Sequence, residues 1–404
     1  MEQGSAPLLR NIRFLQLWIG QGFSFVGDAI SMVAMIILVV ELTGSASAVG
    51  GVLVARLIPT LAGPLIGVLA DRLDRRVIVV AADISRAALM LGIVFVRDIF
   101  ILYALFFLVG VARTFFNPTI RAAFPSVVGS GDLTRANGII SGTFSASIAL
   151  GPALGGLLVA TVGVEAAFLI DAGTYLISAA FLSRIPLPRP EQGGSGGFGT
   201  EFKAGLGYLA RARVPLVIVV GAFFLILTMN TTVPAEVFLA RETFGAGDTG
   251  YGLLVALWGG GMVLGSALIA LLGDRINLLA FYFIGILISA IALTGAGLSP
   301  TFVLALAALT AGGAANGIDN VTTDTILQKR VPEELLGRVF SVRFLTLGVG
   351  EVLAYAAGGL LVDQTGPRIT YVSMGAATAA VGLLILLALA APTHKPTPGN
   401  PDPQ

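Results

Sequence analysis

Carboxylates and arginines stand inside long apolar stretches of this chain, where ionisable side chains are costly. Asp28, Asp171 and Glu351 are acids in such positions, and Arg56 and Arg113 are arginines in similar ones. A charge at the centre of a bilayer costs about 2.5–3.5 kcal/mol even on a lenient scale, so each should face the protein interior and have a partner. A buried carboxylate can also take up and release protons. We hypothesise that Asp28 and Glu351 do this; the alternative is a satisfied structural acid.

Other polar residues in the apolar stretches are weaker candidates. Three asparagines could line a path through the protein or act as hydrogen-bonding glue between helices: Asn230, Asn316 and Asn320. Further acids lie within or at the ends of the stretches: Glu41, Glu236, Asp319, Asp324 and Asp363.

The stretches that carry these residues are long enough to cross a bilayer. Only 12% of the 404 residues are charged, against about 25% in soluble domains, and the mean hydropathy is +0.92. A helix of about 20 residues spans roughly 30 Å of hydrocarbon. Twelve stretches meet this length: 14–41, 47–70, 77–96, 99–122, 136–161, 164–184, 214–240, 249–273, 277–297, 300–324, 338–363 and 367–391. The first is too long for a cleaved signal peptide.

The two halves of the chain repeat each other at an offset of 203 residues. Asp71-Arg72 returns as Asp274-Arg275, GGLLV at 155–159 returns at 358–362, and Gly163 returns as Gly366. This pattern predicts an all-α membrane protein of twelve transmembrane helices in two pseudo-symmetric six-helix bundles, with a transport path between them. The expected parts are an N-terminal bundle, a cytoplasmic linker, a C-terminal bundle and a disordered tail: 1–184, 185–213, 214–391 and 392–404.

Basic residues orient this arrangement in the membrane. Of the 24, 17 fall on the side of the termini and even-numbered loops, and three, Arg97, Arg241 and Arg368, fall opposite. This bias predicts cytoplasmic termini. In the linker, apolar residues recur at helical spacing from Phe198 to Leu209 beside basic residues, which is typical of an amphipathic helix on the membrane surface. We interpret this segment as a helix that simply buries its apolar face against the protein, and we favour this over a regulatory role.

Several kinds of chemistry are not expected. The chain has no cysteine and one histidine, His394 in the tail, which argues against disulfide, haem and zinc sites. No lysine follows a glycine-rich phosphate-binding loop. We therefore expect a monomeric membrane protein that is not an enzyme, with no cofactor, no metal and no nucleic-acid partner.

The loop between the second and third stretches reads GVLADRLDRRV and resembles the signature loop of the major facilitator superfamily. Five residues match the family pattern: Gly67, Asp71, Arg72, Arg75 and Arg76. Asp74 replaces the second glycine of that pattern. In the family, the first aspartate and the later arginine form a cytoplasmic charge latch, and the resemblance assigns this role to Asp71 and Arg75. Asp83 and Arg86, three residues apart on one helix face, could join the latch or form a structural pair.

The fifth stretch contains GPALGG, residues 151–156, in which proline removes a backbone donor and glycines allow close helix contact. It resembles a motif that the superfamily shows chiefly in its exporters. The resemblance implies a bend with a gating role at Gly151, Pro152, Gly155 and Gly156; packing alone is the alternative. Arg113 resembles the buried arginine of another family motif, and we predict that Asp28 is its partner.

The matching segments together resemble the enterobactin-exporter and macrolide-efflux branch of the superfamily. They include RFLQLW at 13–18, NPTIRAAFPSVV at 117–128, LTRANG at 133–138 and VPEELLGRVFSV at 331–342. The resemblance implies a bacterial inner-membrane antiporter that exports small amphipathic molecules, such as drugs or siderophores, in exchange for protons. Alternatives are a facilitator or importer without proton coupling, and a lipid or lysolipid transporter. A membrane sensor would need a folded external domain, and every loop here is short.

Overall fold

A computed structural model describes residues 8–63, 66, 73–187 and 198–391 of the chain. Among these residues, eleven helices are long and apolar enough to cross a bilayer. The shorter apolar segment Ala46–Ala62, second along the chain, lies where the remaining one of the twelve spans is expected. In lipid, a helix satisfies its own backbone hydrogen bonds, which is why apolar stretches of this length fold in this way. The predicted all-helical class is confirmed.

The first half begins with the short turn η1 (Leu8–Arg10) and supplies six of the crossing segments. These are α1 (Ile12–Thr43), α2 (Ala46–Leu57) with its extension η2 (Ile58–Ala62), α4 (Arg75–Val94), α5 (Ile99–Val128), α6 (Leu133–Val162) and α7 (Val164–Leu182). A turn η3 (Ser130–Asp132) joins α5 to α6. The predicted span 47–70 is described as helix only as far as Gly63 and at residue 66; the rest lies outside the described residues.

The second half repeats this order and begins with a broken helix. That helix consists of α9 (Arg213–Asn230), α10 (Val233–Phe238) and the π-helical turn η4 (Leu239–Thr243). The other segments are α11 (Gly247–Leu272), the turn η5 (Gly273–Arg275), α12 (Leu278–Leu298), α13 (Phe302–Arg330), α14 (Glu333–Thr365) and α15 (Pro367–Ala390). The predicted span 214–240 is confirmed as one crossing segment, Arg213–Thr243, although its helix is interrupted at Thr231 and Thr232. Pro234 lacks the N–H that would bond to Asn230, so the helix breaks there.

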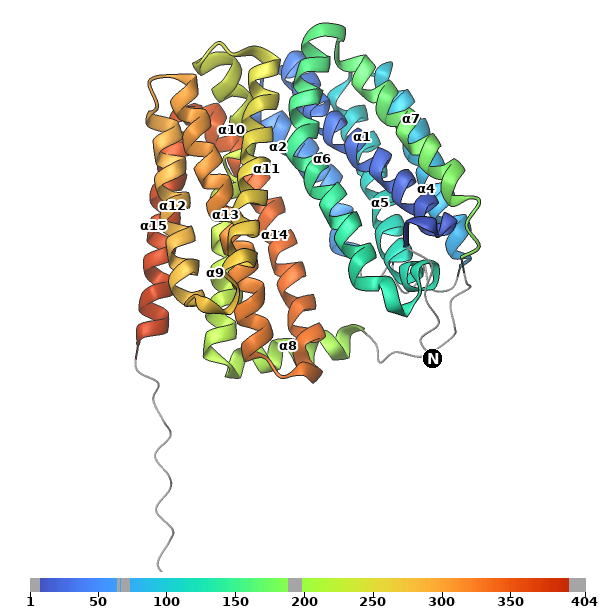
Figure 1. The fold of residues 1–404 in the computed structure, drawn as a ribbon. Helices are drawn as coiled ribbons and strands as arrows, with labels where there is room; N and C mark the ends of the chain where they lie inside the picture. Colours follow the sequence, from blue (N-terminus) through green and yellow to red (C-terminus); the bar gives the residue numbers. More distant parts are fainter. Residues whose placement is uncertain (1–7, 64–65, 67–72, 188–197, 392–404) are drawn as a thin grey trace, which may run out of the picture.

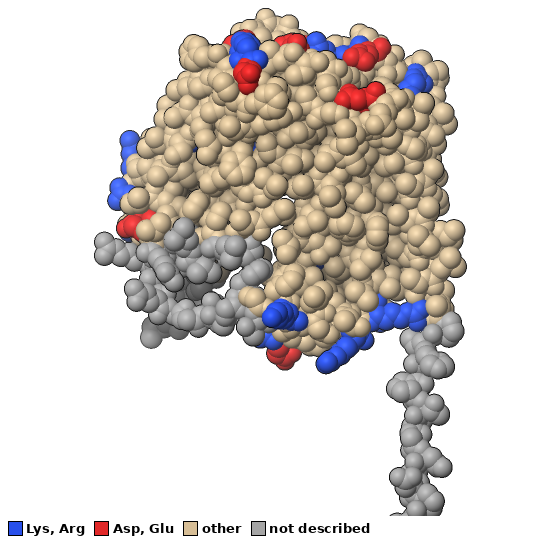
Figure 2. Space-filling view, turned by 180° about the vertical axis from the view of Figure 1, so that it is seen from behind, with Lys and Arg blue, Asp and Glu red and all other residues tan. Residues whose placement is uncertain are grey.

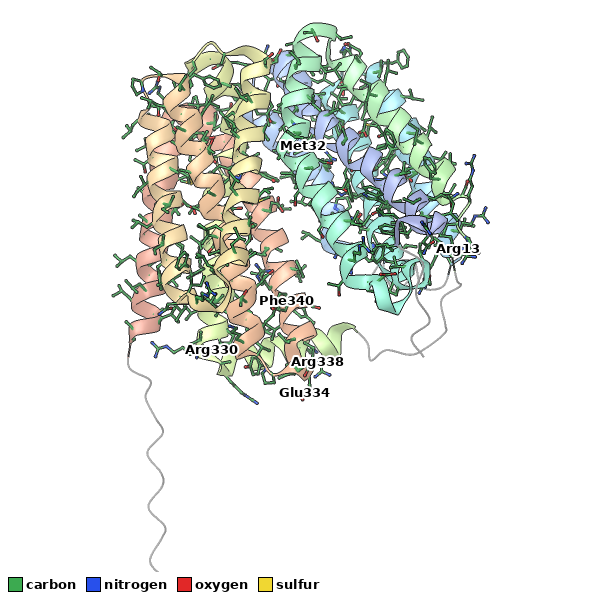
Figure 3. All side chains as sticks on the ribbon, viewed as in Figure 1. Arg13, Met32, Arg330, Glu334, Arg338 and Phe340 are labelled. Atoms are coloured by element: carbon green, nitrogen blue, oxygen red, sulfur yellow. The ribbon has the colours of Figure 1, made fainter. Side chains whose placement is uncertain are left out.

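The two halves meet at one end and diverge toward the other (Figure 1). The end where they meet contains Ser45, Gly163 and Gly366, and we call it the closed end. The opposite end contains Leu8 and Ala390, and we call it the termini end. Figure 2 shows the molecular surface notched between the halves toward the termini end. In Figure 3, Met32 lies near the region where the halves meet, whereas Arg330, Glu334 and Arg338 lie at the termini end.

Glycines bring the halves into backbone contact at two crossings. In one, α6 crosses α11, and an added Cβ on Gly156 would lie 2.5 Å from the carbonyl oxygen of Asp248. In the other, α14 crosses α2, and an added Cβ on Gly359 would lie 2.5 Å from the carbonyl oxygen of Ala46. Gly156 and Gly359 are the second glycines of the two GGLLV runs. The sequence repeat therefore marks both of these glycine crossings.

The repeated glycines that follow these runs also have matching conformations. Gly163 and Gly366 have φ of 105° and 81°, in the region that favours glycine, and they end α6 and α14. Their N–H groups donate to the carbonyls of Val159 and Val362, at 3.0 and 2.8 Å. Residues that are 203 positions apart in the sequence thus occupy equivalent positions in the two halves here.

The linker helix and the outer surface agree with a membrane position. α8 (Phe198–Arg211) lies across the termini end of the second half and packs on α14 (Figure 1). Leu209 is buried, and the Tyr208 hydroxyl donates to the carbonyl of Arg330 at 3.2 Å. On the face in Figure 2, charged residues gather at the two ends and leave an uncharged belt between them. Exposed leucines such as Leu264 and Leu384 suit a lipid-facing surface.

Candidate functional site

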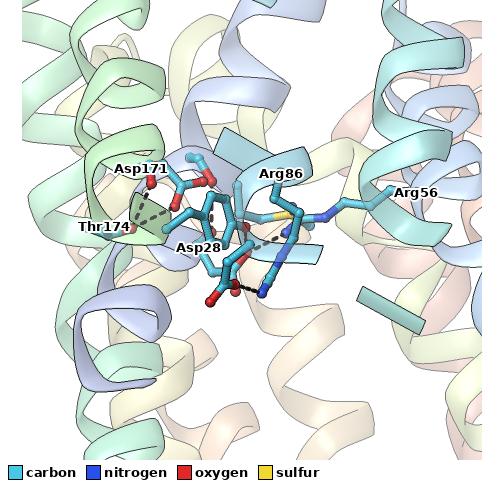
Figure 4. Close-up of polar contacts among 9 residues, drawn as sticks. Asp28, Arg56, Arg86, Asp171 and Thr174 are labelled. Atoms are coloured by element: carbon cyan, nitrogen blue, oxygen red, sulfur yellow. Dashed lines mark hydrogen bonds and ion pairs between the residues drawn. The ribbon is translucent and has the colours of Figure 1, made fainter. Parts of the chain in front are cut away.

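A network of charged residues fills the interior of the first half, midway along its helices (Figure 4). Its centre is Asp28 on α1, whose Oδ1 lies 3.2 Å from the Arg56 Nη2 of α2. The same oxygen accepts a hydrogen bond of 2.7 Å from the Tyr175 hydroxyl of α7. Arg56 also contacts the sulfur of Met32 through Nη1, at 3.1 Å. Side chains from two other helices thus converge on one carboxylate of α1.

The direct partner of Asp28 differs from the prediction. We expected Arg113 of α5, but the ion pair is made by Arg56. Arg113 acts on Asp28 electrostatically at longer range and makes no hydrogen bond or ion pair with another described residue. The reason is helix geometry: α2 packs against α1 with Arg56 pointing into the core, while the face of α5 next to α2 is occupied by Gly110 and Thr114.

Asp171 of α7 lies beside Asp28, where a glycine makes room for it. An added Cβ on Gly27 would lie 2.4 Å from Oδ1 of Asp171, within contact distance of the carboxylate. The Thr174 hydroxyl, on the next turn, lies 3.2 Å from that oxygen and also donates to the backbone carbonyl of Asp171 at 2.8 Å. Asp28 and Asp171 repel each other when both are ionised. The site therefore holds two neighbouring carboxylates on adjacent helices.

Asp83 and Arg86 form an ion pair within α4, and both are buried. The guanidinium of Arg86 also lies over two aromatic rings, 4.5 Å from the centre of Phe116 and 4.3 Å from the centre of Tyr175. Cation–π contacts of this kind fix both the cation and the rings. Arg86 therefore helps to hold Tyr175 where its hydroxyl reaches Asp28. The pair contributes to the interior of the first half.

Glu351 lies on α14 of the second half, on the face turned toward α2. Two contacts define this face: an added Cβ on Gly348 would lie 2.9 Å from Leu61, and Gly50 packs against the carbonyl of Tyr355. The Glu351 carboxylate accepts a hydrogen bond of 2.7 Å from the hydroxyl of Tyr355, one turn away. Arg113 of the other half acts on it electrostatically. Arg113 thus stands between the acids of the two halves.

The predicted asparagines lie apart from this network. Asn320 donates to the side-chain oxygen of Asn316 at 3.1 Å, and both residues belong to α13. The bond therefore lies within one helix and does not join two. Asn230 is the last residue of α9, directly before the break at Thr231 and Thr232. None of the three forms a hydrogen bond with a described charged residue of the first half.

The signature loop is only partly described. Gly67, Asp71 and Arg72 lie outside the described residues, so the predicted latch stays a prediction. Arg75 and Arg76 form the first turn of α4. Asp74, the residue that replaces the family glycine, caps this helix: its side chain accepts hydrogen bonds from the N–H groups of Arg76 and Val77, at 2.9 and 3.3 Å. An N-cap carboxylate suits this position better than a glycine would.

GPALGG lies in α6 between two helices that belong to different halves. Added Cβ atoms on Gly151 and Gly155 would clash with α1, whereas one on Gly156 would clash with α11. Pro152 cannot donate to the carbonyl of Ile148, four residues earlier. That carbonyl instead faces Gly259 of α11, where an added Cβ would lie 2.8 Å from its oxygen. The motif therefore packs both faces of α6; its gating role stays a prediction.

Tyr175 is the member of the site that sequence reasoning missed. It is buried, touches Arg86 and bonds to Asp28. A signal was present, because Tyr175 follows Asp171 by four residues and so shares its helix face. A tyrosine is common in an apolar helix, however, and only the tertiary structure shows that its hydroxyl reaches a carboxylate.

Comparison with known families decides the class of the protein. The family model described as "Transmembrane secretion effector" matches residues 3–399, nearly the whole chain. The chain belongs to this family. The family is part of the major facilitator superfamily, so the protein is a multi-pass membrane transporter with the fold that the sequence predicts.

Relatives within this transporter family include exporters. A putative bacilysin exporter, BacE of Bacillus amyloliquefaciens, is 30% identical over 86% of this chain and 87% of its own length. Macrolide efflux protein A of Streptococcus pyogenes is 25% identical over 94% and 95%. Among solved structures, a variant of the nucleoside transporter NupG superposes with a TM-score of 0.82 at 14% identity, covering 93% of this chain and 99% of that one. This last likeness concerns the fold alone.

Proposed function

We propose that this transporter exports a small amphipathic molecule from the bacterial cytoplasm in exchange for protons. Two kinds of support favour export. GPALGG resembles a motif found chiefly in exporters of the superfamily, and similar proteins carry the names of a bacilysin exporter and a macrolide efflux protein. The cargo of each relative belongs to that relative, and for this chain we propose only a small amphipathic molecule.

The observation that carries the proton coupling is the position of Asp28. Its carboxylate is held by Arg56 and Tyr175 in the interior of the first half, and side chains from α1, α2 and α7 meet there. Protonation of Asp28 would remove the charge that holds Arg56. Because the two residues lie on different helices, the loss of this attraction would change how α1 and α2 pack. A proton can in this way be coupled to a movement of helices.

The structure fits one state of an alternating-access cycle. The bias of basic residues assigns the termini end to the cytoplasm. In that orientation the halves are open toward the inside and closed toward the outside, where the two glycine crossings lie. Rocking of the halves about the central site would exchange the open and closed ends. Cargo would enter from the cytoplasm in this state and leave after the exchange.

The deciding experiment is transport in proteoliposomes with an imposed pH gradient. A susceptibility screen of a pump-deficient host that expresses this chain supplies the cargo. We expect the wild-type protein to move that cargo only when protons flow the opposite way, and Asp28→Asn to abolish the pH-driven component. The matched control is Glu165→Gln, which removes an exposed carboxylate paired with Arg97 at the closed end of the same half.

Each outcome has a distinct meaning. Cargo movement that does not depend on the pH gradient would show a facilitator. Full pH-driven export by Asp28→Asn would exclude Asp28 as the coupling group and turn attention to its neighbour Asp171. Loss of activity in Asp171→Asn with normal activity in Asp28→Asn would assign the coupling to α7.

A further inference from the structure

Asp363, at the end of α14, reaches across from the second half and caps a helix of the first half. Its Oδ1 accepts the N–H of Ala46 at 2.7 Å, and its Oδ2 accepts the N–H of Ser47 at 3.0 Å. The hydroxyl of Ser45 donates to Oδ2 at 2.9 Å. All three partners belong to the start of α2. One side chain therefore makes three hydrogen bonds between the halves.

These bonds satisfy groups that α2 itself leaves unpaired. The first N–H groups of any helix have no partner within that helix, and together they attract negative charge. The Ser45 hydroxyl accepts the N–H of Ala48 at 3.3 Å. Asp363 accepts the two N–H groups before it, those of Ala46 and Ser47. The first turn of α2 is thus completed by a carboxylate from the other half.

The contact has no counterpart at the second crossing. At the offset of 203 residues, Asp363 corresponds to Ala160 of α6, and Ser45 corresponds to Asp248 of α11. There the acid, Asp248, lies in the first turn of α11 itself, and it pairs with Arg241 of the same half, at 3.2 Å. Arg241 also lies 4.0 Å from Glu41 of the first half, but both side chains are partly exposed, so this pair is weak. Among the described residues at the closed end, Asp363 makes three short hydrogen bonds between the halves, whereas Arg241 and Glu41 make one long ion pair.

We propose that Asp363 is a latch that stabilises the state closed toward the outside, and that its release is a step of the transport cycle. The proposal rests on the proposed alternating-access function, because opening toward the outside must separate α14 from α2. The three bonds exist only while the closed end is closed. A contact made in one of two states shifts the population toward that state. Asp363 is thus a positioning residue, which touches neither the cargo nor the proton site.

The test measures distances across the closed end in lipid nanodiscs, without cargo or pH gradient. The chain has no cysteine, so a cysteine introduced at a chosen position is the only one that a spin label modifies. The exposed residues Phe95 and Val303 label the closed end, and Arg121 and Arg330 label the termini end. We expect Asp363→Ala to raise the ratio of outward-open to closed molecules about fivefold, the usual effect of losing one helix cap. Asp363→Asn, which keeps one acceptor oxygen, should have a smaller effect in the same direction.

Glu165→Gln is the control, because it removes a carboxylate at the same end whose ion pair lies within one half. Unchanged distances in Asp363→Ala, or an equal change in Glu165→Gln, would overturn the proposal. The readout does not depend on transport. If pH-driven export fails while the distances shift, the latch stands and the proposed function falls. If export is confirmed and the distances do not move, the latch falls alone.

Discussion

The two halves share one backbone plan but differ in what fills their interiors. In the first half, Tyr175 of α7 bonds to the carboxylate of Asp28 on α1. At the equivalent position in the second half, Thr378 of α15 donates to the hydroxyl of Thr228 on α9, at 3.0 Å. Both contacts join the first and last helices of their bundles. One of them is charged and the other is neutral.

The same difference is found at the positions equivalent to the other charged residues of the first half's network. At the offset of 203 residues, Asp83 and Arg86 correspond to Ile286 and Ser289, and Asp171 corresponds to Met374. Ile286 and Ser289 are buried in their half just as Asp83 and Arg86 are in theirs. The repeat has therefore kept the helix crossings and changed the chemistry between them. The shared helix arrangement therefore does not require charges at these positions of the first half. The second half buries a charge elsewhere, where Arg343 of α14 lies 2.8 Å from Asp324 of α13.

The largest expected effect comes from breaking the buried pair of the first half. Asp83→Ala leaves Arg86 as a buried cation without its partner, which should lower the free energy of unfolding by about 3–5 kcal/mol. The double variant Asp83→Ala/Arg86→Met should lose less than the single one, because it removes the unpaired charge. Thermal unfolding in detergent checks both. A double variant less stable than Asp83→Ala would show that Arg86 stabilises the half through its aromatic contacts.

The next effect concerns the place where α7 approaches α1. Gly27→Ala puts a methyl group into the carboxylate of Asp171 and the hydroxyl of Thr174. Overpacking of this kind costs about 1–3 kcal/mol. The equivalent residue of the second half is Asn230, so Asn230→Ala is the matched control and should leave the melting temperature almost unchanged. Equal losses of melting temperature in the two variants would mean that the close approach of α7 to α1 in the first half is not the cause of the loss.

A third pair of variants separates stability from function. Tyr175→Phe and Thr378→Val each remove one buried hydrogen bond, so each should cost about 1 kcal/mol of stability. Only Tyr175→Phe should alter the pH dependence of transport, because only Tyr175 touches Asp28. Melting curves and proteoliposome assays on the same preparations measure both quantities. A change in pH dependence in Thr378→Val would contradict the view that the neutral contact between α9 and α15 has no part in proton coupling.

The sequence predicted the scaffold well because apolar length and glycine spacing are local properties. The helix positions and the repeat could be read from the sequence, whereas the contacts that the two GGLLV runs make between the halves were found only in the structure. The partner of Asp28 was missed, because hydropathy does not reveal how a helix is rotated about its axis. Arg56 and Arg113 look alike in sequence, and only packing shows which one reaches the carboxylate.

The capping contacts show the same limit. Asp363 could be recognised as an acid at the end of a span, but not as a cap for a helix more than 300 residues away. Asp74 seemed a departure from the family pattern, and it became explicable once α4 was seen to begin at Arg75. Contacts between residues close in the sequence can be predicted from it, whereas contacts between distant helices depend on the assembled fold.

The smallest expected effect comes from Asn320 of α13. Its hydrogen bond to Asn316 lies within one helix, and Asn320 itself is exposed, so Asn320→Ala should change the free energy of unfolding by no more than about 0.5 kcal/mol. Asn316 corresponds to Arg113 in the repeat. The two asparagines therefore lie on the helix face of α13 that is equivalent to the face of α5 carrying Arg113. If Asn320 lines the path, the variant should weaken the apparent affinity for cargo at unchanged stability. A stability loss above about 1 kcal/mol with normal transport would instead show that the asparagines serve packing. These asparagines would then make no contribution to transport.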